Sequence, residues 1–256
     1  MKIHFSLLLL LIFNPFFYKS TTAQPAAKPV VGWNYQKLNT AVNETYMTKA
    51  EKEMILEINK VRSNPKKYAE EIEPLFEKAV QRLKTYGKGV RSATYQTTIY
   101  TADNRKSEKV DTIWLFKNEE EVKAIESLIK HLNHLRPLSV LQPSNGIYLA
   151  ARKHAIDQVP SGSINHVGTD NSWPWDRIRK SAPTMKEGNE NIACGSENAR
   201  DIVIQLLIDS GIPGYGHRET LLDSRWTHCA CYCVGKIPKG ISCTYWIQNF
   251  GTIYSF

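Results

Sequence analysis

The sequence predicts an α+β fold for this chain of 256 residues. Two observations favour that class: apolar residues recur at helical spacing along much of the chain, and two strand-like segments, 227–235 and 241–253, close it. A Gly-Lys-Ile-Pro-Lys-Gly turn separates these segments, as in an antiparallel pair. With 42% hydrophobic residues the chain can bury a core, so disorder, collagen, coiled coils and polytopic membrane proteins are disfavoured.

Residues 1–23 have the pattern of a secretory signal peptide. Lys2 precedes a short apolar run over 5–13, and small residues at Thr21 and Ala23 follow as a cleavage signal. The run is too short to span a bilayer comfortably. The alternative, a buried N-terminal helix or strand, leaves the processing pattern unexplained. We therefore expect a secreted or periplasmic protein with no transmembrane anchor in the mature chain.

One domain is predicted after this leader. Residues 24–46 contain Pro and Ala and lack periodicity, so we expect a tether before a domain over 47–256. A first helix over 48–63 is predicted from apolar residues at i, i+4 and i+7. Further helices are predicted over 68–83, from Asn118 to Pro137, after Ser144, and from Ser196 to Gly211.

The segment 84–117 has a different character. Two strand-like runs, 94–100 and 111–116, surround a polar turn over 102–109. The segment contains seven basic and three acidic residues, so it holds much of the positive excess of a chain whose formal charge is +8. We expect an inserted β-hairpin. Nucleic acid is disfavoured as a partner, because export removes it from reach.

Because the chain is expected to be exported, its five cysteines can form disulfides. All five lie beyond the leader, and an odd number leaves at least one thiol unpaired. Cys229, Cys231 and Cys233 alternate, so in a strand they share one face. We favour a disulfide from one of these three to Cys243 across the terminal hairpin, with Cys194 as the fifth cysteine. A zinc cluster is the alternative, although alternate residues do not resemble C-x₂-C knuckles.

Three segments could support chemistry: 165–178, 188–195 and 209–218. Each places a His or an acid beside glycines, where a loop can present it without burying it. Two imidazoles and a carboxylate could bind a divalent metal, at a site with water in the open positions, or act as a general acid and base. The alternative is that the histidines bond to nearby backbone and that the acid caps a helix or turn.

Other residues give weaker signals. His154 lies on the Ala-rich face of a predicted helix and is expected to be a satisfied core or border histidine. Trp173 and Trp175 either stack on a ligand or pack their loop. The chain has no G-x-S-x-G nucleophile elbow, no P-loop and no dinucleotide fingerprint.

Four motifs occur in order along the second half of the chain: H-V-G-T-D-N-S-x-P-x-x-R-I, N-E-N-I-A-x-G, G-H-R-x-x-L-L and Y-W-I-Q-N-F-G. Together they resemble the CAP superfamily, which comprises cysteine-rich secretory proteins, antigen 5 and pathogenesis-related 1 proteins and is also called the SCP domain. The resemblance covers about 49–255, and the long tract before Leu138 is more similar to bacterial members.

The resemblance implies a three-layer α-β-α sandwich with a small antiparallel sheet. It also implies a cleft with two histidines and two acids, which holds zinc or another divalent ion in some members. His166 corresponds to the first histidine, Glu190 to the Glu of the G-E-N-I motif, and His217 to the second histidine. The fourth member is Asp209, displaced by one place, or is missing with Ser210 instead, because the preceding Trp of the family is absent here.

We therefore expect an exported CAP-domain binding or interaction protein, whose cleft takes a divalent cation through His166, His217, Glu190 and Asp209. Its partner would be a lipid, glycan or protein of the bacterial envelope or extracellular space. The alternative is a hydrolase, directed at proteins or cell wall, in which Glu190, His166 or His217 activates water with or without a metal. Lipid or sterol binding is a third reading, and the sequence leaves open whether the protein is an enzyme.

Overall fold

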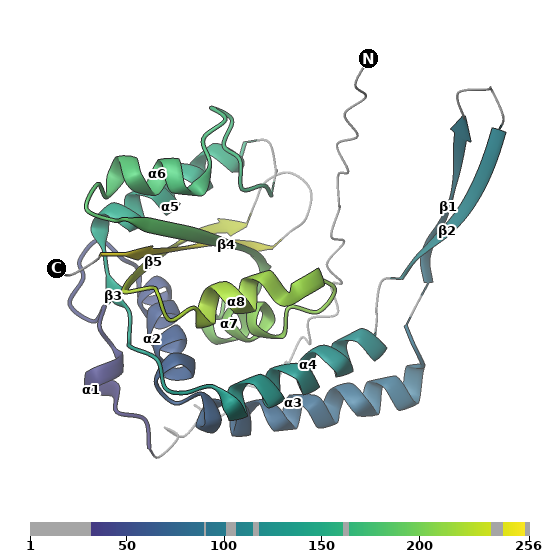
Figure 1. Cartoon of the computed structure of the whole chain (residues 1–256), viewed down its shortest axis with the longest axis horizontal. Helices are drawn as coiled ribbons and strands as arrows, with labels where there is room; N and C mark the ends of the chain where they lie inside the picture. Colours follow the sequence, from purple (N-terminus) through teal and green to yellow (C-terminus); the bar gives the residue numbers. More distant parts are fainter. Residues whose placement is uncertain are drawn as a thin grey trace.

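The chain folds as a three-layer α-β-α sandwich, in which a four-stranded sheet lies between two layers of helices (Figure 1). This architecture confirms the fold class expected from the sequence and its family resemblance. The computed structural model describes residues 32–89, 91–100, 106–114, 118–160, 164–236 and 243–253, with the backbone for 91–100 and 106–114. The predicted signal peptide and the first part of the predicted tether lie outside the described residues.

The helices and strands have the following bounds. The helices are α1 (Tyr35–Leu38), α2 (Lys49–Ser63), α3 (Pro65–Tyr86), α4 (Asn118–His134), α5 (Asn145–Gln158), α6 (Pro174–Ser181), α7 (Ala199–Ile208), the short 3₁₀ turn η1 (Pro213–Tyr215) and α8 (Gly216–Leu222). The strands are β1 (Arg91–Tyr100), β2 (Lys106–Trp114), β3 (Gln142–Pro143), β4 (Glu187–Gly195), β5 (His228–Lys236) and β6 (Thr244–Thr252). No helix of the described segments is long and apolar enough to cross a membrane.

Helix α2 illustrates how local sequence sets these elements. Its first turn is closed by a capping box, because the Glu51 carboxylate accepts a hydrogen bond from the Thr48 backbone N–H (2.7 Å) and the Thr48 hydroxyl accepts one from the Glu51 backbone N–H (3.3 Å). Met54, Ile58 and Val61 then lie on one face and are buried. The helix predicted over 48–63 is confirmed.

The sheet has the strand order β3-β5-β6-β4, with β6 antiparallel to both of its neighbours and β3 parallel to β5. Every residue of β6 is buried, since helices cover both faces of this central strand. Strand β4 lies at the sheet edge and contains Glu190. The expectation that a loop presents Glu190 is therefore wrong: the residue is buried in a strand, because packing against both helical layers outweighs the polar local sequence.

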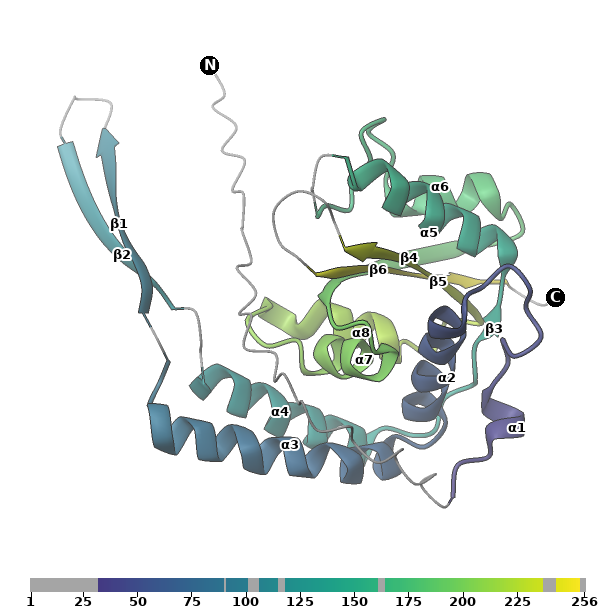
Figure 2. The same cartoon turned by 180° about the vertical axis from the view of Figure 1, so that it is seen from behind.

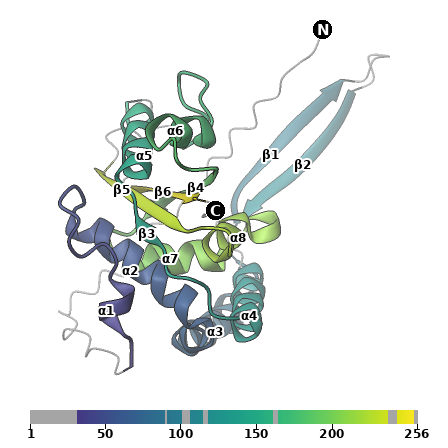
Figure 3. The same cartoon turned by 60° about the vertical axis from the view of Figure 1, so that its left-hand side comes forward.

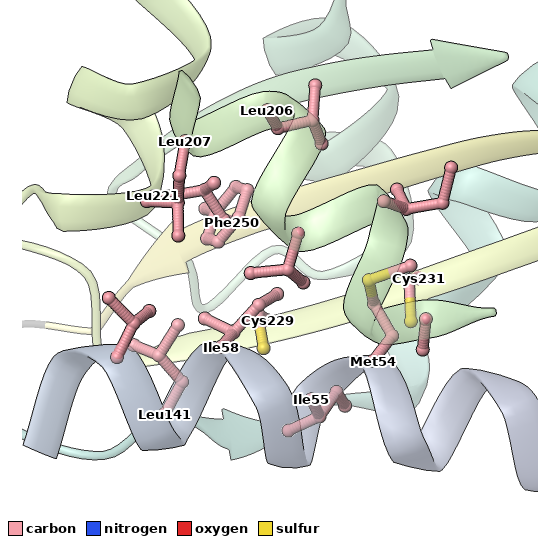
Figure 4. Close-up of a cluster of buried hydrophobic side chains, with 14 of the residues drawn as sticks. Met54, Ile55, Ile58, Leu141, Leu206, Leu207, Leu221, Cys229, Cys231 and Phe250 are labelled. Carbon is pink, nitrogen blue, oxygen red and sulfur yellow. The ribbon is translucent and has the colours of Figure 1, made fainter. Parts of the chain in front are cut away.

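The two faces of the sheet are covered by different helices. Helices α5 and α6 pack on one face, and α2, α7 and α8 pack on the other (Figures 2 and 3). The larger core lies on the second face, where Met54 and Ile58 of α2 meet Leu206 of α7 and Phe250 of β6 (Figure 4). The smaller cluster on the first face joins Ala151 and Ala155 of α5 to neighbouring β6 side chains.

The described part of the predicted tether, residues 32–46, is packed rather than extended. Leu38 and Ala41 are buried, and the Trp33 indole N–H donates to Glu71 Oε1 at 2.9 Å. Asn59 of α2 donates from its amide to the Leu38 carbonyl oxygen at 3.0 Å. The folded body therefore begins before residue 47. The apolar residues of this segment pack against α2 and α3, but they lack a regular spacing from which that packing could be predicted.

The insertion forms a two-stranded antiparallel hairpin, as expected, with Tyr95 opposite Asp111. It projects from the adjacent ends of α3 and α4, away from the sheet domain (Figure 1). Asn118 links these two ends beneath the hairpin. Its backbone N–H donates to the Lys88 carbonyl oxygen (2.9 Å) and its side-chain amide to that of Gly87 (2.8 Å). Residues 102–105 of the predicted polar turn lie outside the described residues, and 106–109 belong to β2 rather than to the turn.

The disulfide joins Cys194 to Cys243, so the pairing favoured from the sequence is wrong. In the antiparallel register, Cys229, Cys231 and Cys233 lie opposite Phe250, Gln248 and Trp246, and opposed residues share a face of the sheet. Cys243 belongs instead to the small cluster on the α5 side, together with Cys194 of the other neighbouring strand. The three cysteines of β5 are free.

Candidate histidine–carboxylate site

His166 and Glu190 form the first of two histidine–carboxylate pairs. His166 follows α5 in a loop, and its Nδ1 lies 3.0 Å from Glu190 Oε1. The Glu190 side chain is completely buried on β4, whereas 45% of the His166 side chain is exposed. The imidazole therefore connects a buried carboxylate to the solvent.

The charge of Glu190 is compensated inside the protein. Arg177 of α6, whose side chain is only 1% exposed, donates from Nη2 to both carboxylate oxygens, at 3.0 and 2.9 Å. The Asn249 side-chain amide, oriented to donate, lies 3.1 Å from Glu190 Oε2. Both carboxylate oxygens are thus engaged by protein groups, and the side chain has no solvent contact.

Arg177 also shapes the loop that carries His166. Its Nη2 donates to the His166 carbonyl oxygen at 3.0 Å, and its Nη1 donates to that of Ser172 at 2.7 Å. Between these points the Gly168 N–H donates to the Ser172 carbonyl oxygen at 2.9 Å, and Asn171 adopts a left-handed conformation with φ of 60°. One guanidinium thus fixes both the carboxylate and the backbone of the histidine loop.

His217 and Asp209 form the second pair. Asp209 is the left-handed C-cap of α7, with φ of 52°, and is buried. Its Oδ1 lies 2.7 Å from His217 Nδ1, and its Oδ2 accepts the His217 backbone N–H at 2.9 Å. The adjacent Arg218 donates to the Leu207 and Ile208 carbonyl oxygens at the end of α7, which fixes the start of α8 beside it. Asp209, despite its displacement in the motif, is thus the acid that contacts the second histidine.

The two pairs flank the edge strand β4 from opposite faces. Neighbouring strand residues point to opposite faces of a sheet, so Glu190 faces α6 while Asn191 faces α8. The Asn191 side-chain amide donates to the His217 carbonyl oxygen at 3.2 Å. The motif N-E-N-I therefore supports one histidine with its Glu and the other with its second Asn.

This geometry fixes the tautomer of both imidazoles. Because an ionised carboxylate only accepts hydrogen bonds, each Nδ1 carries the proton and each Nε2 keeps its lone pair. Within the described segments, no hydrogen bond engages either Nε2. No three His, Cys, Asp or Glu side chains of the described residues are grouped as a metal ion would require, so the four predicted ligands form two pairs rather than one cluster. Donors suitable for a divalent transition metal remain at the two Nε2 atoms.

Three residues around Glu190 have roles that the sequence did not predict: Arg177, Asn249 and His154. The first two belong to the recognised motifs, and their position there was the available signal. His154 was expected to be satisfied, but only its Nε2 has a partner, the Asn165 carbonyl oxygen at 2.7 Å. Its buried Nδ1 contacts no hydrogen-bonding group of the described residues. Burial lowers the pKa of His154, because the charged imidazolium would be desolvated.

The free cysteines do not offer a nucleophile. Cys229 and Cys231 are buried. Burial raises the pKa of Cys229 to about 12, and burial together with the nearby Glu51 raises that of Cys233 to about 12. These thiols stay protonated at neutral pH, and the thiolate is the reactive form. The three sulfurs also form no metal cluster within the described part of the chain, so the zinc alternative for them has no support.

Comparison with known proteins gives a family match for the second half of the chain. Residues 130–250, which include both pairs and the four motifs except the final Gly251, match the family model described as "CAP: Cysteine-rich secretory protein family". An outer surface protein from Borrelia burgdorferi is 18% identical over 62% of this chain and 100% of its own, with a TM-score of 0.38. An extracellular protein containing a SCP domain from Bacillus anthracis str. Ames is 13% identical over 68% of this chain and 71% of its own, with a TM-score of 0.37. No curated protein matches the chain. Residues 130–250 are therefore a CAP domain, in agreement with the resemblance of the sequence motifs.

Proposed function

We propose that this protein is an exported binding module that receives its ligand at the Nε2 atoms of His166 and His217. One observation supports this proposal above others: each Nδ1 is held by a buried carboxylate, at 3.0 Å for His166 and 2.7 Å for His217. A carboxylate behind an imidazole fixes the orientation and the tautomer of the ring, as in the second shell of metal-binding histidines. Both side chains reach the solvent, with 45% and 23% exposure.

A divalent cation such as zinc is the ligand that this arrangement would suit. The two imidazoles would supply the protein ligands, and water or a partner molecule would occupy the other positions. Glu190 and Asp209 then act behind the histidines and do not touch the ion. This assignment changes the four-ligand site expected from the sequence into a two-histidine site supported by two acids.

Binding is favoured over hydrolysis by the environment of Glu190. A general base must reach the proton that it removes, and this carboxylate is fully buried and paired with Arg177. If the protein is a hydrolase after all, the base is His166, since an imidazole with its Nδ1 on a carboxylate and its Nε2 toward solvent is the usual general-base pair. This second candidate rests on the exposure of His166 alone.

Calorimetric titration of zinc into residues 24–256 tests the binding proposal. We expect binding to be lost in His166→Ala and in His217→Ala, since each removes a ligand. Glu190→Gln keeps both Nε2 atoms and should weaken binding by about 10–100-fold. The matched control is His134→Ala, at an exposed histidine on the last turn of α4, which should bind like the unmodified protein. Unchanged zinc affinity in both site variants would refute the two-histidine site.

The hydrolase candidate has a separate test. Casein and peptidoglycan are incubated with the protein and with His166→Ala, with and without a chelator. We expect no turnover by either protein. Turnover that disappears in His166→Ala and persists in His134→Ala would replace the binding proposal with the hydrolase.

A further inference from the structure

The layer formed by α5, α6 and the described part of the loop between them exposes four large apolar side chains. Its large exposed hydrophobic side chains are Leu149 (44% exposed), Ile156 (48%), Ile164 (43%) and Trp173 (60%). The other such residues of the described segments lie elsewhere: Tyr35 and Val42 in and just after α1, Tyr86 at the end of α3, and Ile253 after β6. Apolar side chains gathered on one layer usually indicate a surface that contacts another phase or molecule.

On α5 these residues lie on the side opposite the sheet. Leu149, Arg152 and Ile156 are spaced i, i+3 and i+7, so they form one stripe along the helix. The buried face of the same helix carries Ala151 and Ala155, which pack against β6. The exposed side of the helix thus carries two large apolar side chains and a cation.

Helix α6 runs antiparallel beside α5 and extends this surface. A Cβ at Gly146, at the start of α5, would meet the Ser181 carbonyl oxygen at the end of α6. At the other end, Asp157 of α5 accepts a hydrogen bond from the Thr169 backbone N–H at 2.8 Å, in the loop that leads to Trp173. Figure 3 shows the two helices side by side on the outer face of the sheet. Trp173 therefore lies near the Ile156 end of α5.

The charged groups of this surface favour an anionic partner. Arg152, Arg179 and Lys180 are exposed, and none has an ion pair within the described residues. Lys153 is paired with Asp170 at 2.8 Å. The remaining acid of α6, Asp176, accepts the Trp173 backbone N–H at 3.0 Å and is exposed. Unpaired cations thus outnumber unpaired acids.

We propose that the α5–α6 surface, defined by Leu149, Arg152, Ile156, Trp173, Arg179 and Lys180, docks the protein on a bilayer that contains anionic lipid. Exposed Trp, Leu and Ile insert at the headgroup boundary, and Arg and Lys meet lipid phosphates, which is the combination that peripheral membrane surfaces use. This interaction is separate from ligand binding at His166 and His217 and does not depend on it.

Vesicle co-sedimentation of residues 24–256 tests the proposal. We expect binding to vesicles of phosphatidylcholine mixed with phosphatidylglycerol, weaker binding to phosphatidylcholine alone, and release by salt. Arg179→Glu/Lys180→Glu should lower the partition coefficient by about tenfold or more, since each cation near an anionic surface contributes about 1 kcal/mol. Trp173→Ala should also lower the partition coefficient. Without the Trp173 indole, the blue shift of tryptophan fluorescence on vesicle binding should disappear.

Matched controls lie on α3, where Tyr86 is 68% exposed and Lys66 and Lys78 are exposed. Lys66→Glu/Lys78→Glu and Tyr86→Ala should bind vesicles nearly as well as the unmodified protein. Equal losses in the α3 and α6 charge variants would overturn the proposal, because the attraction would then follow net charge alone. If Trp173→Ala still bound vesicles fully, and if soluble polyphosphate competed away all binding, the surface would be a site for polyanions. That result would also overturn the proposal.

Discussion

At the scale of single residues, the candidate site depends on Arg177. This buried guanidinium neutralises Glu190 and at the same time holds the carbonyl oxygens of His166 and Ser172. The sequence placed Arg177 in a motif but gave it no role, because nothing in the local pattern tells which distant acid an Arg will meet. The same limit applies to Asn249, whose partner lies on the neighbouring strand.

Loss of this cation should destabilise the fold. Arg177→Met leaves the Glu190 carboxylate buried without its arginine partner, and breaking such a pair costs about 3–5 kcal/mol of the free energy of unfolding. Urea denaturation of both proteins measures the difference. Arg177→Met/Glu190→Gln removes both charges and should recover part of the loss. The exposed Arg179→Met, as a control, should change stability by less than about 0.5 kcal/mol. A small loss in Arg177→Met would mean that Glu190 is not held as a buried anion.

His154 should give the fold a pH dependence. Burial lowers its pKa in the folded protein from the ordinary 6.5; the Glu190 carboxylate opposes this shift, and Arg177 adds to it. The unfolded chain therefore takes up the proton first as the pH falls, so stability is complete above about pH 6.5 and decreases below it, by up to about 1.4 kcal/mol per pH unit. His154→Gln should flatten this slope between pH 7.5 and 5.5 in urea denaturation. Identical slopes in the two proteins would show that His154 does not titrate differently in the two states.

At the scale of elements, amphipathic helices were predictable and edge strands were not. Helix α2 follows from its capping box and its apolar spacing, both of which are local. Strand β4 has polar residues where it passes the site, and it is a strand only because β6 pairs with it and helices cover it. The disulfide was mispredicted for a related reason: Cys243 lies just before β6, and the face of the sheet on which it lies depends on the strand register, which no single segment contains.

The corrected pairing has a chemical signature. With Cys194 and Cys243 joined, three thiols remain, and Cys229 and Cys231 are buried. The native protein should react with no more than one equivalent of a thiol reagent, slowly and at the half-buried Cys233. In urea without reductant it should react with three equivalents, and after reduction with five. Cys233→Ala should abolish the native reaction. One equivalent in urea without reductant would indicate a second disulfide.

At the scale of the whole molecule, the family resemblance predicted the three-layer sandwich, whereas the strand-like runs and basic composition of residues 84–117 predicted the hairpin. The packed segment after residue 32 was missed, because its apolar residues are isolated and make sense only against α2 and α3. The hairpin, by contrast, could be predicted from its local sequence pattern, because its two strands contact mainly each other and have few contacts with the rest of the fold.

Removal of the hairpin should leave the body folded. Residues 90–117 would be replaced by a short Gly-Ser linker between Gly89 and Asn118, whose backbone already bonds to Lys88. We expect the free energy of unfolding to change by less than about 1 kcal/mol, because shortening a loop slightly reduces its closure entropy. Thermal or urea denaturation measures the effect. A loss of several kcal/mol would show that the hairpin supports α3 and α4.

The Asn118 link between the ends of α3 and α4 has a practical consequence. The polypeptide leaves the folded body and returns to it at neighbouring points, so this connection is a suitable insertion site for a foreign sequence. An epitope, or a folded reporter whose own termini lie close together, could replace the hairpin without stretching the helices. Because this insertion site lies at the ends of α3 and α4, a reporter placed there would label the protein without covering the histidine pairs or the α5–α6 surface.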